Sequence, residues 1–241
     1  MTTATRTPVR ARVWQALDTV RDPELDQPIT ELGFVTEVGV DEQSPSGCAV
    51  LVRLRLPTYF CAPNFAFLMV ADAHDAVRTI AGVSAVEIRL EDHFAAEQIN
   101  AGAAAGAGFT GAFGPQSGGE LAELRLAFQR KAHLACLERA SRQLIADGWQ
   151  IEALAQAELS DLPAGPERDS LLRRRADLGL SAASDARLFV DDEGDPVPAE
   201  NLPGRLRFAR AVRVSVDGNA HLCRGLLQTR YGIQAPKEDE R

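Results

Sequence analysis

The chain has 241 residues, of which 45% are hydrophobic and 25% are charged, and its net charge is -8 at pH 7. This length suits one large domain or two small ones, and an acidic surface argues against non-specific nucleic-acid binding. The sequence has no apolar run of 18 residues, and its polar start, Met1 to Thr7, lacks the apolar core of a signal peptide. We therefore expect a cytoplasmic protein whose four scattered cysteines stay reduced.

The first part of the chain alternates between helical and strand patterns. In the second predicted strand, apolar residues alternate with Arg53 and Arg55, which is typical of a sheet with one covered face. Pro8 favours the start of the first helix, and Gly82 the end of the second. The sequence thus predicts a small two-layer α/β (α+β) domain with a three-stranded mixed sheet over residues 8–94. The order is helix, strand, strand, helix, strand, at residues 8–22, 34–40, 48–56, 63–81 and 83–90.

Residues 95–119 are dominated by glycine and alanine. Such a stretch has few side chains to bury and much backbone entropy to lose, so we expect a linker. An alternative is a lid that becomes ordered when Phe109 and Phe113 dock.

Residues 120–236 predict a second, mainly helical domain with a short β pair. The Arg173-Arg174-Arg175 run and the arginines of residues 205–213 would form solvated faces or dock an acidic partner. The expected helices cover residues 120–147, 150–162, 167–178 and 220–231, and the expected strands cover residues 188–190 and 211–216.

One turn of the first domain carries the chemistry. Cys61 follows a strand and precedes Pro63, the expected start of a helix, so the positive end of the helix dipole would favour its thiolate. Thr58 lies three residues before it, and Asp22 and Glu24 flank Pro23 upstream. If the fold joins these loops, they form a site of one thiol, one hydroxyl and two acids. The alternative is that Asp22 only caps a turn and Glu24 is solvated.

The order of these motifs resembles the metal–sulfur cluster assembly family, which includes SufT-type maturation factors and the D protein of phenylacetate-ring oxidation. The family outline is matched by Asp22-Pro23-Glu24-Leu25, by the run from Ile29 to Val35, and by Thr58 and Cys61. Pro57 stands where the family usually has a first threonine, and Ala62 separates Cys61 from Pro63. The resemblance covers residues 8 to about 93.

The resemblance implies an accessory role in assembling iron–sulfur clusters or metal centres, not catalysis. The expected cargo is an iron–sulfur cluster or iron, held transiently by Cys61, because iron prefers thiolate ligands. Asp22, Glu24 and Thr58 would surround the thiol. Expected partners are a client metalloprotein, for example a multicomponent oxygenase, the cluster assembly machinery, or a second copy of the chain.

Three alternatives stay open from the residues alone. His133, Cys136 and Cys223 could form a second metal site if their helices packed together, or they could be core residues. Cys61 could be a nucleophile with His74 or His93 as its base. The whole chain could instead be a non-metal adaptor or chaperone for an oxygenase subunit.

Overall fold

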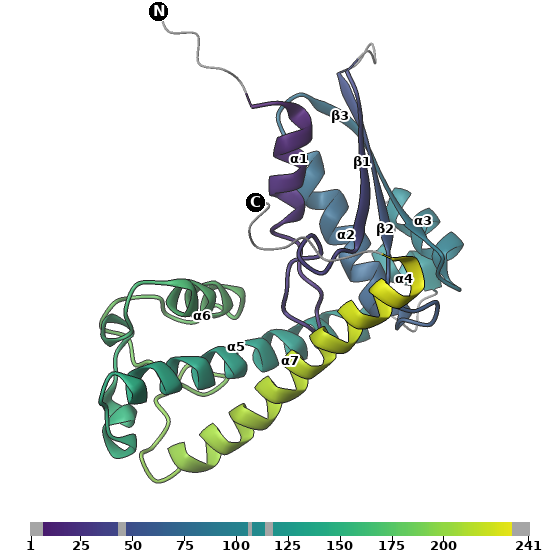
Figure 1. Ribbon diagram of the computed structural model, residues 1–241. Coiled ribbons are helices and arrows are strands. Elements are labelled where there is room, and N and C mark those ends of the chain that lie inside the picture. Colours follow the sequence, from purple (N-terminus) through teal and green to yellow (C-terminus); the bar gives the residue numbers. More distant parts are fainter. Residues whose placement is uncertain (1–6, 43–46, 106–107, 114–117, 233–241) are drawn as a thin grey trace, which may run out of the picture. The chain divides into compact units, whose positions relative to one another are not determined.

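The computed structural model describes residues 7–42, 47–105, 108–113 and 118–232, which divide into two compact units (Figure 1). Met1–Ala122 and Asn219–Arg241 form the first unit, and Glu123–Gly218 form the second. The tip of the predicted hairpin, parts of the glycine-rich segment and the charged tail lie outside the described residues. No helix in the described ranges is long and apolar enough to cross a membrane.

The first unit contains the predicted three-stranded mixed sheet, with strand order β1-β2-β3. Strand β1 (Val35–Asp41) pairs antiparallel with β2 (Cys48–Arg55), and β2 pairs parallel with β3 (Val83–Glu91). A parallel pair needs a crossover, and α2 (Pro63–Arg78) supplies it. Helix α1 (Val9–Leu17) lies with α2 against the sheet.

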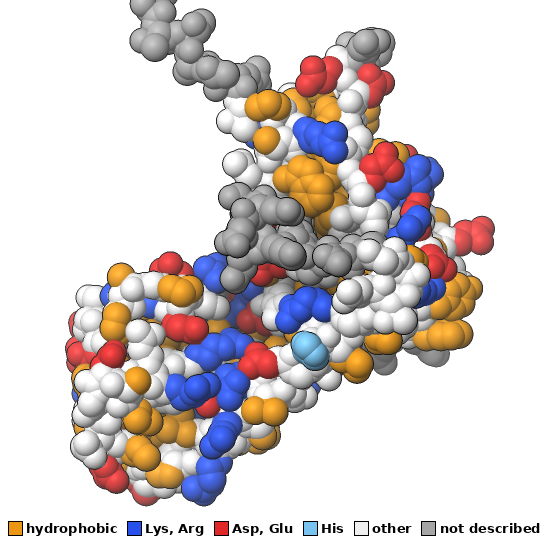
Figure 2. Space-filling view, in the orientation of Figure 1, with side chains coloured by type: hydrophobic (Ala, Val, Ile, Leu, Met, Phe, Trp, Pro, Cys, Tyr) orange, Lys and Arg blue, Asp and Glu red, His pale blue; other side chains and the backbone are white. Residues whose placement is uncertain are grey.

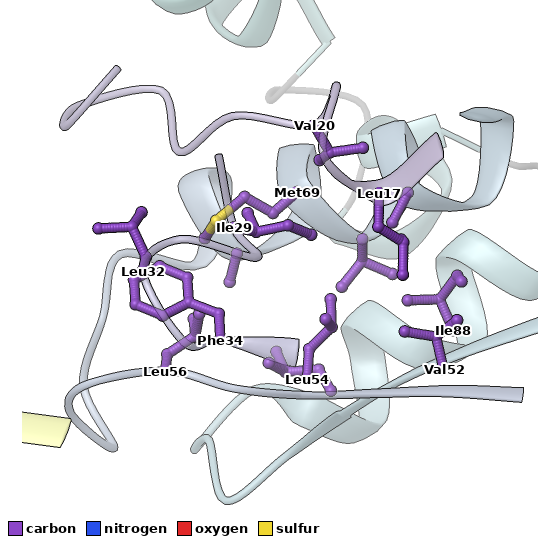
Figure 3. Close-up of a cluster of buried hydrophobic side chains, with 14 of the residues drawn as sticks. Leu17, Val20, Ile29, Leu32, Phe34, Val52, Leu54, Leu56, Met69 and Ile88 are labelled. Carbon is purple, nitrogen blue, oxygen red and sulfur yellow. The ribbon is translucent and has the colours of Figure 1, made fainter. Parts of the chain in front are cut away.

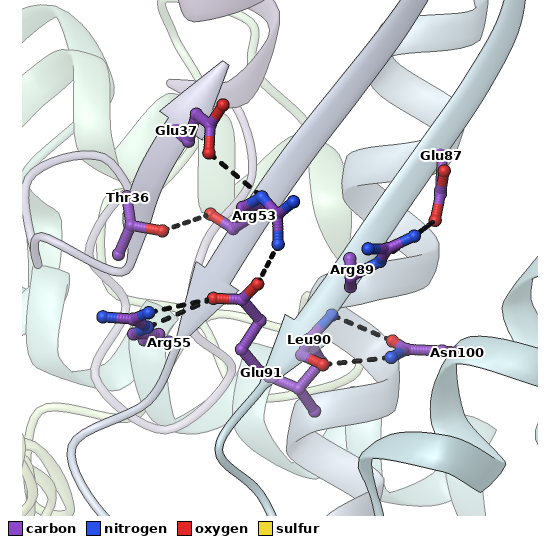
Figure 4. Close-up of polar contacts among 9 residues, drawn as sticks. All are labelled: Thr36, Glu37, Arg53, Arg55, Glu87, Arg89, Leu90, Glu91 and Asn100. Atoms are coloured by element: carbon purple, nitrogen blue, oxygen red, sulfur yellow. Dashed lines mark hydrogen bonds and ion pairs between the residues drawn. The ribbon is translucent and has the colours of Figure 1, made fainter. Parts of the chain in front are cut away.

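The core lies between the sheet and these helices (Figure 3). Val52 and Leu54 point into it from β2 and Ile88 from β3, while Leu17 and Met69 meet them from the helices. The opposite face of the sheet is polar, as the alternation predicted. There, Figure 4 shows arginines and glutamates cross-linking the strands through contacts that include Arg53–Glu91, Arg53–Glu37 and Arg55–Glu91.

The linker expected at residues 95–119 is corrected by the structure. It contains helix α3 (Ala96–Ala104) and the short helix α4 (Gly108–Phe113). Ile99 of α3 is fully buried in the first core, and Phe113 packs against that core. A Cβ on Gly102 would lie 2.4 Å from the Cβ of Ala112, so a glycine is what allows the two helices to approach closely.

The second unit is helical and has its own core. Two of the helices in this part of the chain extend across the boundary between the units. The β pair that the sequence predicted here is wrong. Residues 211–216 lie within α7, and residues 188–190 make only an isolated bridge, Val190 to Pro196. The elements of this part of the chain are α5 (Gly118–Ala146), the 3-10 helices η2 (Ile151–Gln156) and η3 (Leu159–Asp161), α6 (Pro166–Asp177) and α7 (Leu202–Tyr231).

The boundary predicted for the C-terminal domain is also corrected. Helix α7 is continuous, yet its residues from Asn219 onward belong to the first unit. Ala220 and Leu227 are 0% and 1% exposed within the first core. We call Asn219–Tyr231 the returning segment.

Most of the arginines expected on solvated or docking faces are held inside the second unit. Arg175 is 2% exposed and donates to the carbonyl oxygens of Ser181, Arg187 and Leu188. Arg213 contacts the buried carboxylate of Glu138 at 2.5 Å. Arg174 pairs with Asp177 and Arg205 with Asp192. Figure 2 shows acidic side chains interspersed among the remaining surface Lys and Arg on the face in view.

Candidate functional site

Cys61 lies in a turn between β2 and α2, which we call the Cys61 turn (residues 57–62). Its side chain is half-buried and packs against the first core. Helix α2 begins at Pro63 with Ala62 as its N-cap, so the thiol lies beside the helix N-terminus, as predicted. The Sγ atom of Cys61 is 3.3 Å from Oγ1 of Thr58. The structure therefore brings together the thiol and hydroxyl that the sequence singled out.

The loop after β3 holds the Cys61 turn in place. Nδ1 of the buried His93 accepts the backbone N–H of Ala95 at 3.2 Å, so the proton lies on Nε2, which donates to the Cys61 carbonyl at 2.7 Å. The N–H of Phe94 also donates to the carbonyl of Tyr59 at 3.1 Å. Both ring nitrogens of His93 are engaged with the backbone, which gives this histidine a positioning role instead of the role of a base.

Asp22 lies in a tight loop between α1 and β1, which we call the acidic loop (residues 21–28). Its Oδ1 accepts the backbone N–H groups of Glu24 and Leu25 at 2.9 and 2.8 Å. Asp22 therefore caps a turn, as the second of the two interpretations of the sequence predicted. It is also 7% exposed, and burial raises its pKa to about 6 despite these two bonds.

Replacing Asp22 by asparagine is expected to stabilise the first unit at pH 7. The asparagine oxygen can still accept both backbone bonds. Because the folded-state pKa of Asp22 lies above its unfolded value, its ionisation favours unfolding, and the loss of stability grows as the pH rises from 4 to 6. We expect the variant to gain about 1–3 kcal/mol at pH 7.

Urea unfolding at pH 7 and pH 4 measures this difference. The chain has two tryptophans, and Trp14 packs against the first core while Trp149 packs against the second. A Trp149→Phe background thus makes Trp14 the reporter. The gain should vanish near pH 4, and an equal gain at both pH values would contradict the role of the charge.

Glu24 is half-buried, and its Oε1 accepts a hydrogen bond from Nδ2 of Asn219 at 3.2 Å. This bond joins the acidic loop to the returning segment. One turn further along the segment, burial raises the pKa of the Cys223 thiol to about 11, reinforced by the charges of Asp22, Cys61 and Glu24. Cys223 packs against the first core. The sequence analysis placed it with His133 and Cys136 in a possible second metal site.

The other two members of that second candidate site lie in the second unit. His133 is 1% exposed, and burial, with the charges of Arg175 and Arg205, lowers its pKa to about 4. Cys136 is 1% exposed, with Sγ 3.5 Å from Oγ of Ser170. No single unit contains His133, Cys136 and Cys223 together.

Three aromatic side chains, two from the Cys61 turn and one from the loop after β3, contact one another. Tyr59, Phe60 and Phe94 lie with ring centroids 5.0–6.4 Å apart, and Phe60 is 77% exposed. Exposed aromatic residues that touch one another are typical of protein-binding surfaces. We call these three residues the aromatic rim; the sequence analysis did not identify it.

Within the described ranges, no three His, Cys, Asp or Glu side chains are arranged to hold a metal ion. A closed metal site normally has four protein ligands.

The Cys61 turn and the acidic loop both belong to the two-layer domain of the first unit. The sequence pattern of a family described as "Iron-sulfur cluster assembly protein" matches residues 10–89. A curated protein of Methanocaldococcus jannaschii, itself described as uncharacterized, is 32% identical over 88 residues. That match covers 36% of this chain and 86% of the relative. No solved structure matches the chain.

The chain belongs to the iron–sulfur cluster assembly protein family through this segment. The matched residues contain α1, α2, β1, β2 and most of β3, and they include the acidic loop and the Cys61 turn. Residues 90–241, including the returning segment, lie outside the family match.

Proposed function

We propose that the protein receives iron or an iron–sulfur cluster at Cys61 and passes it to a client metalloprotein without catalysing a metabolic reaction. The observation that carries the proposal is the half-buried Cys61 thiol, bonded to Thr58 beside the N-terminus of α2 in a domain of this family. A thiolate is a preferred ligand for iron, and this thiol lies beside the N-terminus of α2. In the reducing cytoplasm, our proposed location, the thiol would remain free to act.

The surroundings of the thiol support delivery to another protein. The aromatic rim exposes apolar surface beside Cys61, so a client could bury the rim while its own ligands take the cargo. We propose that the client is a component of a multicomponent oxygenase, with the assembly machinery as donor. The second unit would add contacts specific to that client.

Anaerobic reconstitution of the full chain with ferrous iron and sulfide tests the proposal. We expect visible absorbance and bound iron and sulfide in the wild type, and neither above background in Cys61→Ser. Cys48→Ser is a matched control because Cys48 lies at the start of β2, the end of the strand away from the Cys61 turn. A wild type that binds no iron, or a Cys61→Ser variant that loads fully, would overturn the proposal.

A second candidate function is a non-metal adaptor or chaperone for an oxygenase subunit. The exposed aromatic rim favours it, because protein binding alone would explain that surface. The same reconstitution separates the two functions, since an adaptor yields no absorbance. If the adaptor function holds, substituting serine for Phe60 should weaken client binding.

A further inference from the structure

The end of the returning segment lies against the ends of two sheet strands. The centroid of the Tyr231 ring is 5.4 Å from the guanidinium carbon of Arg55, the last residue of β2. The hydroxyl of Tyr231 donates to a carboxylate oxygen of Asp92, directly after β3, at 2.6 Å. Burial and this bond raise the pKa of Tyr231 to about 12, so the hydroxyl stays protonated and continues to donate. Tyr231 therefore connects the two strand ends from which the Cys61 turn and the loop after β3 emerge.

Asp92 is the residue on which the contacts of this segment converge. Besides accepting from Tyr231, its carboxylate pairs with Arg230 at 2.7 Å. Its backbone has a φ of 53°, in the left-handed region that few residues other than glycine, asparagine and aspartate adopt. Such a conformation persists only where the surrounding contacts hold it. Two adjacent residues of α7 thus hold the first residue of the loop after β3 (residues 92–95).

The next two residues of this loop hold the Cys61 turn. Nε2 of His93 donates to the Cys61 carbonyl at 2.7 Å, and the N–H of Phe94 donates to the Tyr59 carbonyl at 3.1 Å. His93 is 4% exposed, so its bond is shielded from competing water. A shift of Asp92 would therefore move the two donors that fix the backbone around Cys61.

We propose that Arg230 and Tyr231 are positioning residues for the Cys61 thiol, acting through Asp92 and His93. The proposal rests on the function proposed above, because it concerns how the thiol that would bind iron is held. The last turn of α7 restricts the loop after β3, and that loop keeps the thiol half-buried in one place. A group that is already ordered loses less entropy when it binds a ligand than a mobile one does.

These positioning contacts come from outside the family pattern. The family match ends at residue 89, so Asp92, His93 and both α7 residues lie beyond it. The matched segment supplies the thiol, and the rest of the first unit supplies the contacts that hold it. The returning segment would then position the site as well as complete the core.

Alkylation of the native chain by iodoacetamide, resolved by peptide mass spectrometry, measures how each thiol is held. Cys48 is the internal control, because it is also half-buried but lies at the other end of β2. In an Arg230→Gln, Tyr231→Phe double variant, Asp92 loses both partners while the loop keeps its own sequence. We expect Cys61 to react at least about threefold faster than in the wild type, because lost local contacts increase local opening, and Cys48 to react at the wild-type rate.

Two substitutions test the link through His93. His93→Gln keeps an amide donor that can reach the Cys61 carbonyl, whereas His93→Leu has no donor. We expect Cys61 to react near the wild-type rate in the first variant and at least about threefold faster in the second. The matched control is Asp75→Asn, which removes an exposed ion pair with Arg78 on α2 and should leave the reactivity of Cys61 unchanged.

A double variant whose Cys61 reacts at the wild-type rate would overturn the proposal. Equal acceleration of Cys61 and Cys48 would also overturn it, because the domain as a whole would then have loosened. If His93→Gln reacted as fast as His93→Leu, the imidazole would not act as the donor that holds the turn. Alkylation needs no iron, so a wild type that loads no iron overturns the proposed function and leaves the positioning of the thiol intact.

Discussion

Replacing Cys61 with serine is expected to abolish delivery of an iron–sulfur cluster to an acceptor. Serine preserves the size of the side chain and a hydrogen bond to Thr58, whose Oγ1 now lies 3.3 Å from the sulfur. It does not preserve the thiolate, and an alcohol does not ionise near neutral pH to replace it as an iron ligand. The loss should exceed the roughly 10- to 100-fold effect of changing a group outside the first coordination shell.

The measurement is anaerobic transfer from the loaded protein to an apo-ferredoxin, followed by the visible circular dichroism of the acceptor. Ferredoxin serves as a defined acceptor of the same cargo. The Cys48→Ser control should transfer at the wild-type rate. Equal rates for Cys61→Ser and the wild type would show that the turn is not the route of transfer.

Replacing Arg175 with methionine is expected to destabilise the second unit by about 3–5 kcal/mol. Methionine has similar length but no donors, and it would leave the carbonyl oxygens of Ser181, Arg187 and Leu188 without those bonds. Burial already lowers the pKa of Arg175, so its charge is tolerated only because these carbonyl groups receive it. Few single changes on this helix should cost more.

Urea unfolding followed by Trp149, in a Trp14→Phe background, reports on this unit. The matched control is Arg173→Met, because Arg173 is exposed on the same helix and its loss should change the unfolding free energy by less than about 0.5 kcal/mol. Equal effects of the two substitutions would mean that the carbonyl contacts contribute nothing.

Much of the first unit was predictable because its signals are local. The alternation in β2, the period of apolar residues in α1 and the glycine after α2 each depend on neighbours within a few positions. The Cys61 turn followed from the proline and from the switch between strand and helix patterns. The order of the family motifs then predicted that Asp22 and Cys61 belong to one site.

The errors arose where distant contacts overrode local pattern. Val212, Val214 and Val216 alternate like a strand, yet Ala209, Val216 and Ala220 follow the helical period and are buried, which favours α7. Residues 95–119 are rich in glycine and alanine, which predicted a linker. Gly102 instead allows α3 and α4 to pack closely.

The packing of Cys223 against the first core could not be predicted for a related reason. About 160 residues separate this cysteine from Cys61, and no spacing rule links positions so far apart. The nearest signal was the stripe of Ala220, Cys223 and Leu227 on one face of the last helix, which marks a buried face but not the surface that covers it.

The division of the first unit between the two ends of the chain constrains how the protein is made. Residues 219–231 emerge from the ribosome after the whole second unit, so the assembly domain cannot bury Ala220 or Leu227 until the second unit has been synthesised. The second unit, by contrast, is one uninterrupted stretch and can fold earlier. A fragment ending at Ala122 would match the family in sequence yet expose part of its own core.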